Sequence, residues 1–255
     1  MSADVEPTDM APAGIKPAGT AQRAFAWLVH FYTALGLVCA AGMAVLIVAG
    51  EDRSLRWAFA LMVVATGIDA TDGWLARRAH VKEVLPDFDG SLLDNLIDFH
   101  TYTSLPLLLL WRAGIPGGAL AGTLLVPLLA SAYGFSKTDA KTSDGFFLGF
   151  PSYWNIVAVY LYTLRLPAFG AAAALLVLAL MTFVRTPYLY ASRGGPFAKT
   201  INVGAVLYSL VLGGALLGPA PLLRPLLLLS LIYPALYMVL STVVAVRLSR
   251  RSTAR

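Results

Sequence analysis

The stretch that decides the fold runs from Gly67 to His100 and reads GIDATDGWLARRAHVKEVLPDFDGSLLDNLIDFH. Its most unusual members are four carboxylates within or beside hydrophobic runs: Asp69, Asp72, Asp94 and Asp98. An ionised side chain at membrane depth is costly, and residues of this kind usually serve a function. The stretch therefore predicts a membrane protein with a functional site between two neighbouring helices.

Composition outside this stretch agrees with a membrane protein. Of 255 residues, 58% are hydrophobic and only 13% are charged, unlike an ordinary soluble domain. Several apolar runs approach the roughly 20 residues that a spanning helix needs. Backbone groups in lipid must be paired within the segment, which favours helices. We predict an all-α integral membrane protein, a polytopic bundle of about eight transmembrane helices at 25–49, 55–78, 91–112, 116–136, 146–164, 167–190, 201–218 and 222–246.

The chain is expected to form a single membrane domain over residues 20–255. Residues 1–19 are rich in proline and alanine, carry acidic residues, and lack the basic start and apolar core of a signal peptide, so we expect a mobile tail. Cys39 is the only cysteine, which excludes an intrachain disulfide and a cysteine metal site. The net charge of +5 comes mostly from short loops, so we expect no nucleic-acid partner.

The same loop charges predict the orientation. With the N-terminus in the cytoplasm, 14 of the 19 basic residues fall on the cytoplasmic side, as the positive-inside rule requires. Eight spans then place both termini in the cytoplasm. The end of the second run and the start of the third lie on the cytoplasmic side as well, so the carboxylates are expected to face the cytoplasm.

Helical spacing arranges the carboxylates in two stripes with small residues. Positions i, i+3, i+4 and i+7 share a helix face, and this spacing relates Asp69, Asp72, Gly73 and Ala76. A second stripe, with spacing i, i+4 and i+8, comprises Gly90, Asp94 and Asp98. Antiparallel packing of the two helices would bring the four carboxylates together.

Four like charges cannot share a partly buried site without cations to neutralise them. Oxygen ligands with no histidine or cysteine in the set favour Mg²⁺ or Mn²⁺, and two such ions, typical of phosphoryl chemistry, would balance the charge. The alternative for an aspartate at a helix end is a cap or a solvated charge. Both interpretations stay open for Asp87 and Asp89 in the linker.

These residues resemble the signature of the CDP-alcohol phosphotransferase family, with Asp69-x-x-Asp72-Gly73-x-x-Ala76-Arg77 followed by Gly90-x-x-x-Asp94-x-x-x-Asp98. The resemblance implies that Asp69, Asp72 and Asp94 are metal ligands. It implies that Asp98 is both a metal ligand and the general base. The nucleotide and its diphosphate would lie against Asp69, Gly73, Ala76, Arg77 and Gly90.

The linker and a later block narrow this resemblance. The twelve residues between Arg77 and Gly90, and the block Phe146-Phe147-Leu148-Gly149-Phe150-Pro151-Ser152-Tyr153-Trp154-Asn155, are similar to the bacterial phosphatidylcholine synthase branch. The reaction so implied is transfer of the phosphatidyl group of CDP-diacylglycerol to choline with release of CMP. The implied setting is the bacterial inner membrane, with membrane lipid as a partner and a homodimer as the assembly.

Further residues are candidates for binding the substrates. Choline is a quaternary ammonium that aromatic faces and a nearby negative charge hold best. The candidates for this are Tyr102, Asp144, Phe150, Tyr153 and Trp154, although aromatic residues at a membrane interface are often belt residues. Arg185 and Arg193 are candidates for the lipid phosphate, with a position at the cytoplasmic edge as the alternative for Arg185.

Two other functions stay open on the sequence. The first is the same reaction with serine, inositol or glycerol phosphate as acceptor. The second is a cation transporter that uses intramembrane aspartates. Transporters often show corresponding broken helices in two inverted halves. Here the membrane-depth carboxylates all lie in one helical hairpin, which favours the enzyme.

Overall fold

The computed structural model describes residues 19–140, 142, 145–190 and 197–253, with side chains through residue 247. The predicted tail over residues 1–19 lies outside the described residues except for Gly19. The elements, in order, are α1 (Thr20–Ala49), α2 (Asp52–Arg78), α3 (Val81–Val84), α4 (Gly90–Asp98), η1 (Phe99–Ser104), α5 (Leu105–Arg112), η2 (Gly118–Leu124), α6 (Leu125–Ser136), β1 (Phe146–Leu148), α7 (Trp154–Leu164), α8 (Ala168–Met181), β2 (Pro187–Leu189), α9 (Ala198–Leu217), α10 (Ala220–Ser230) and α11 (Ile232–Thr253).

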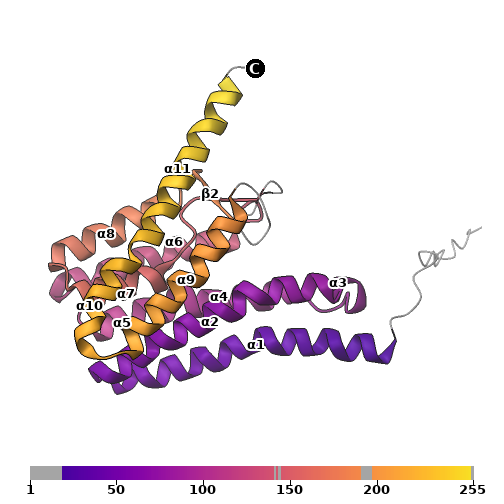
Figure 1. The fold of residues 1–255 in the computed structure, drawn as a ribbon, viewed down its shortest axis with the longest axis horizontal. Helices are drawn as coiled ribbons and strands as arrows, with labels where there is room; N and C mark the ends of the chain where they lie inside the picture. Colours follow the sequence, from indigo (N-terminus) through magenta and orange to yellow (C-terminus); the bar gives the residue numbers. More distant parts are fainter. Residues whose placement is uncertain (1–18, 141, 143–144, 191–196, 254–255) are drawn as a thin grey trace, which may run out of the picture.

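Helices α1 and α2 form a long antiparallel hairpin along one side of the molecule (Figure 1). Helix α1 ends at Gly50, whose left-handed conformation (φ 69°) suits glycine and lets its N–H donate to the carbonyl of Leu46 at 3.2 Å. The hairpin packs against α4 and α9, and α5 to α8 complete the body. Helix α11 packs against α9 and β2, and its C-terminal end extends away from the body (Figure 1).

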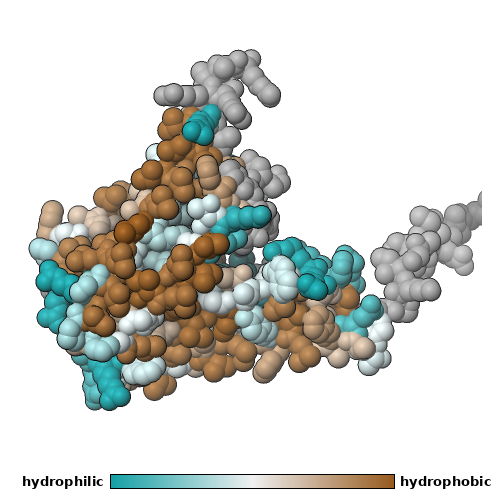
Figure 2. Space-filling model, in the orientation of Figure 1, coloured by the Kyte–Doolittle hydropathy of each residue, from teal (hydrophilic) through white to brown (hydrophobic). Residues whose placement is uncertain are grey.

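The chain has the fold class of an all-α membrane protein, with two short strands as its only sheet among the described residues. Five helical stretches within the described residues are long and apolar enough to cross a membrane: Thr20–Ala49, Asp52–Arg78, Gly118–Ser136, Ala198–Leu217 and Ala220–Arg247. Figure 2 shows a broad hydrophobic surface over the helices, with hydrophilic residues gathered near α3 and at the opposite end of the hairpin. The count of eight spans stays a prediction.

Two of the predicted helical runs are only partly helical. The run 146–164 begins with strand β1, and the run 167–190 ends with strand β2, so the expectation of uninterrupted helices was wrong there. The strands pair antiparallel, with Phe147 opposite Tyr188. Gly149 follows β1 at φ 93°, and a Cβ there would lie 2.3 Å from the carbonyl oxygen of Thr182. Both the positive φ and the close backbone approach require glycine at this position.

A hydrophobic core joins α1, α2 and α5 to α10. The side chains of Phe59, Leu109 and Trp154 are fully buried in it. The indole N–H of Trp154 donates to the hydroxyl of Ser131 at 2.7 Å, which satisfies the polar groups of both side chains in the interior. Beside this core, α4 contacts α1, and η1 contacts both α1 and α2.

Candidate active site

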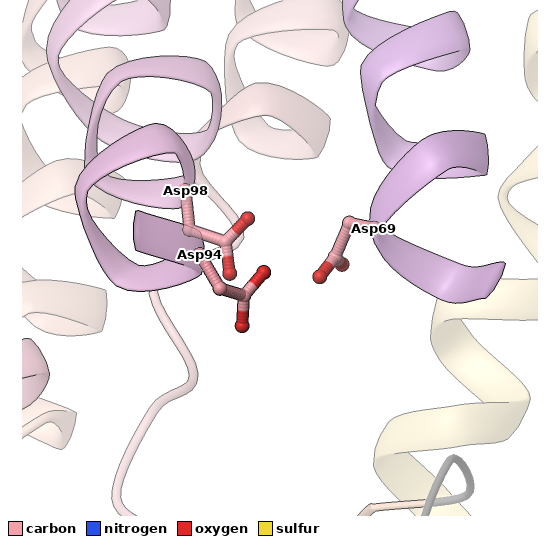
Figure 3. A group of neighbouring side chains, drawn as sticks. All are labelled: Asp69, Asp94 and Asp98. Carbon is pink, nitrogen blue, oxygen red and sulfur yellow. The ribbon is translucent and has the colours of Figure 1, made fainter. Parts of the chain in front are cut away.

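Three of the four predicted carboxylates meet between α2 and α4. One oxygen each of Asp69, Asp94 and Asp98 lies within 4.8 Å of the others. Asp94 and Asp98 are one turn apart on α4 and point across the gap toward Asp69 on α2 (Figure 3). The predicted convergence is therefore present for three of the four carboxylates.

Asp72 belongs to the same cavity although it is outside this group of three. The cavity is lined by Thr33, Gly36, Ala65, Ile68, Asp69, Asp72, Asp94, Ile97, Asp98 and Thr101. Asp72 is 5% exposed, so a charged carboxylate there is largely removed from water. Burial of like charges at such short range is unfavourable, which makes the cavity suited to a cation.

Sequence reasoning missed the wall that α1 contributes. Gly36 faces α4 so closely that a Cβ on it would lie 2.5 Å from Cγ2 of Ile97. Small residues permit such close helix approach in membranes. Gly36 and Thr33 of α1, together with Thr101 of η1, also line the cavity. The only signal in the sequence was a glycine inside an apolar helix, which by itself does not name the facing helix.

The predicted choline-binding residue Tyr102 lies at the carboxylates. Its hydroxyl donates to Oδ2 of Asp69 at 2.7 Å, and its side chain is buried. Tyr102 belongs to η1, a π-helical turn that directly follows Asp98. Its ring centroid lies 6.3 Å from that of Tyr153, another predicted choline-binding residue.

The other choline candidates lie in different surroundings. Phe150 and Trp154 are in the hydrophobic core, where their rings meet edge to face with centroids 5.2 Å apart. Tyr153 is half-buried and has Tyr237 of α11 on its other side, with ring centroids 6.1 Å apart. The fifth candidate, Asp144, lies outside the described residues.

The nucleotide candidates other than Asp69 do not line the cavity within the described chain. Arg77 is exposed near the end of α2, and a Cβ on Gly73 would lie 3.3 Å from its Nη1. Ala76 packs against a small apolar cluster of α1 and the linker. The His30 ring faces Gly90 so closely that a Cβ there would lie 2.4 Å from Cε1 of the ring.

Among the remaining polar candidates, Arg185 and Asp89 have contacts in the structure. Arg185 is exposed, and its Nη2 lies 2.8 Å from Oδ2 of Asp139. Arg193 lies outside the described residues. Asp89 caps α4 by accepting from the N–H groups of Ser91 and Leu92 at 2.9 and 3.0 Å, and Asp87 is exposed in the linker. The open question for Asp89 is answered by a capping contact.

We expect Trp154→Phe to act on stability and not on choline. The change leaves Ser131 without the indole donor and shrinks a fully buried side chain, so it should cost about 1–3 kcal/mol. Thermal unfolding in detergent should show the loss while the KM for choline stays within about twofold. Trp111→Phe, at a residue 60% exposed, is the matched control. A raised KM with unchanged unfolding would instead indicate that Trp154 contacts choline.

The donor set fits a hard divalent cation. The group of three that the structure brings together consists of carboxylates alone. Mg²⁺ and Mn²⁺ prefer such oxygen ligands, whereas zinc sites usually include histidine or cysteine. Asp69, Asp94 and Asp98 could therefore hold a metal ion of this kind.

Fold and cavity together define an all-α integral membrane protein with a carboxylate cluster suited to divalent cations. No family model matches the chain. Over 208 residues it is 36% identical to a phosphatidylcholine synthase of Pseudomonas aeruginosa, a match that covers 81% of this chain and 85% of that protein. It is 38% identical over 185 residues to a phosphatidylcholine synthase of Legionella pneumophila, covering 70% of each chain.

A third relative, a phosphatidylcholine synthase of Borreliella burgdorferi, is 34% identical over 169 residues, which are 66% of this chain and 71% of that one. The chain belongs to the phosphatidylcholine synthase family. The resemblance that the motif and the twelve-residue linker indicated is thereby confirmed.

Proposed function

We propose that this chain transfers the phosphatidyl group of CDP-diacylglycerol to choline and releases CMP. The observation that carries the proposal is the convergence of Asp69, Asp94 and Asp98 in a chain that belongs to the phosphatidylcholine synthase family. Such a reaction needs a site that tolerates a diphosphate at the membrane surface. A carboxylate cluster can do so only with bound cations, because carboxylates alone would repel the diphosphate.

The proposed metal ligands are Asp69, Asp72, Asp94 and Asp98, which would hold two Mn²⁺ or Mg²⁺ ions. When bound, the ions supply charge neutralisation for the diphosphate and for the leaving CMP. The support for this assignment is the all-oxygen donor set and the burial of Asp72.

Asp98 is the proposed general base. The choline hydroxyl oxygen forms a bond to the β-phosphorus, the bond from that phosphorus to the CMP oxygen breaks, and its electron pair leaves with CMP. Asp98 accepts the hydroxyl proton in this step. Support comes from the position of Asp98 on the cavity wall, half-buried and one turn from Asp94.

The proposed substrate-binding residues fall into three groups, for the nucleotide diphosphate, the lipid phosphate and choline. Arg77, exposed near the end of α2, is suited to meet the nucleotide diphosphate, with Gly73 beside it. Arg185 remains a candidate for the lipid phosphate and would then exchange its contact with Asp139. For choline, Tyr153 has more support than Phe150 and Trp154, because its ring lies 6.3 Å from the ring of Tyr102, whereas Phe150 and Trp154 belong to the hydrophobic core.

The topology belongs to the same proposal. We propose eight spans with both termini in the cytoplasm, an active site that faces the cytoplasm, and a place in the bacterial inner membrane. The excess of basic residues on one side of the predicted spans and the bacterial relatives support this arrangement. The homodimer that the resemblance implies also remains a proposal.

Purified full-length chain in detergent, supplied with CDP-diacylglycerol, labelled choline and Mn²⁺, tests the function. We expect choline-dependent release of CMP and labelled phosphatidylcholine. Excess EDTA should abolish both, and added Mn²⁺ or Mg²⁺ should restore them. Labelled serine, inositol and glycerol phosphate are the matched acceptors, and incorporation of serine without choline would reject the choline assignment.

A further inference from the structure

We propose that Tyr102 is a positioning residue for the metal site, because its hydroxyl holds the carboxylate of Asp69 in the orientation that faces Asp94 and Asp98. The inference rests on the proposed function, since it concerns the same cation site. It gives Tyr102 a task different from contact with choline. A tyrosine hydroxyl on a ligand carboxylate would set the direction of that ligand before any ion arrives.

The contact itself has the geometry of a strong hydrogen bond. The phenol oxygen of Tyr102 lies 2.7 Å from Oδ2 of Asp69, between residues 33 positions apart on two different elements. Hydrogen bonds to a carboxylate are shorter and stronger than those between neutral groups. Tyr102 is 8% exposed, so water has little access to compete for this bond.

The position of Tyr102 depends on an irregular turn. Residues Phe99–Ser104 form the π-helical segment η1, which begins directly after Asp98. A π-helical turn is wider than an α-helical turn and re-aims the side chains that follow it, and such turns are frequent at functional sites. The side chain of Tyr102 therefore extends from η1 to the carboxylate of Asp69 on α2.

Further contacts connect Tyr102 and the Asp69 helix to distant elements. The Tyr102 ring is followed by those of Tyr153 on α7 and Tyr237 on α11, and the Tyr237 hydroxyl donates to the carbonyl of Leu189 on β2 at 3.0 Å. In addition, Asn155 of α7 donates to Oγ1 of Thr66 at 3.2 Å, three residues before Asp69. The orientation of Asp69 thus depends on elements far away in the sequence.

The decisive variant is Tyr102→Phe, which keeps the ring and removes only the hydroxyl. Mn²⁺ binding to the purified full-length chain, without any lipid or choline, should weaken by about 10- to 100-fold, measured by calorimetry or by the electron paramagnetic resonance of free Mn²⁺. Tyr233→Phe on α11 is the matched control. It also removes a phenol hydrogen bond, which Tyr233 donates to the carbonyl of Ile201 at 3.0 Å. That control should bind Mn²⁺ like the unaltered chain.

Activity provides a second measurement with a different signature. For Tyr102→Phe, CMP release should return toward the level of the unaltered chain as Mn²⁺ is raised, while the KM for choline at saturating Mn²⁺ stays within about twofold. Unchanged Mn²⁺ affinity together with a raised KM for choline would overturn the inference and assign Tyr102 to choline. Unchanged Mn²⁺ affinity with unchanged kinetics would overturn it as well.

A double-variant comparison guards against a general folding defect. In an Asp69→Asn background, adding Tyr102→Phe should cause little further loss of Mn²⁺ affinity, because the bond that it removes no longer positions a charged ligand. Fully additive losses would contradict the inference. An unaltered chain that binds Mn²⁺ but releases no CMP with choline would reject the proposed function and leave the role of Tyr102 testable by binding alone.

Discussion

Asp98→Asn should lower choline-dependent CMP release by about 10²- to 10⁴-fold or more, the range that a general base contributes. The amide has nearly the shape of the carboxylate but cannot accept the hydroxyl proton at neutral pH. The effect should fall on kcat, measured as CMP release at saturating choline and Mn²⁺. Asp87→Asn is the matched control, because it removes a carboxylate that is exposed in the linker and lies outside the cavity.

The same variant also separates the two proposed roles of Asp98. If it is base and ligand, Mn²⁺ binding should weaken as well, and raising Mn²⁺ should not restore turnover. Restoration of turnover by Mn²⁺ alone would leave Asp98 as a ligand and remove it as the base. Unchanged turnover in Asp98→Asn would reject both roles.

The second large effect concerns the cluster as a cation site. Asp94→Asn removes one of the three carboxylates whose oxygens lie within 4.8 Å of one another, and it should lower both Mn²⁺ affinity and CMP release by at least about 100-fold. The effect on the ion can be measured without substrate, as the stabilisation of the folded chain by Mn²⁺. At 100 times its dissociation constant, a ligand that binds only the folded state stabilises it by about 2.7 kcal/mol.

This stabilisation can be measured by thermal unfolding in detergent, once with EDTA and once with Mn²⁺. The unaltered chain and the Asp87→Asn control should gain stability in Mn²⁺, whereas Asp94→Asn should gain little at the same concentration. An equal gain in all three proteins would show that the ion binds elsewhere. Such a result would contradict the cation site without bearing on the family to which the chain belongs.

The sequence by itself determined the membrane class and the meeting of the carboxylates. Long apolar runs limit the fold to helices because lipid offers the backbone no hydrogen-bond partners. Helical periodicity then places Asp94 and Asp98 on one face. The linker of twelve residues between Arg77 and Gly90 makes antiparallel packing against the Asp69 helix the simplest arrangement. These inferences needed only residues close together in the chain, and the structure brings Asp69, Asp94 and Asp98 together accordingly.

Only the tertiary structure decided what surrounds the carboxylates. It places the hydroxyl of Tyr102 on Asp69, seats Gly36 against Ile97, and buries Trp154 beside Ser131 in the core. It also replaces parts of two predicted helices with the strands β1 and β2. Each of these is a contact between residues distant in sequence. A local pattern tells which face of a helix is buried, but the partner on that face follows only from how all the helices pack together.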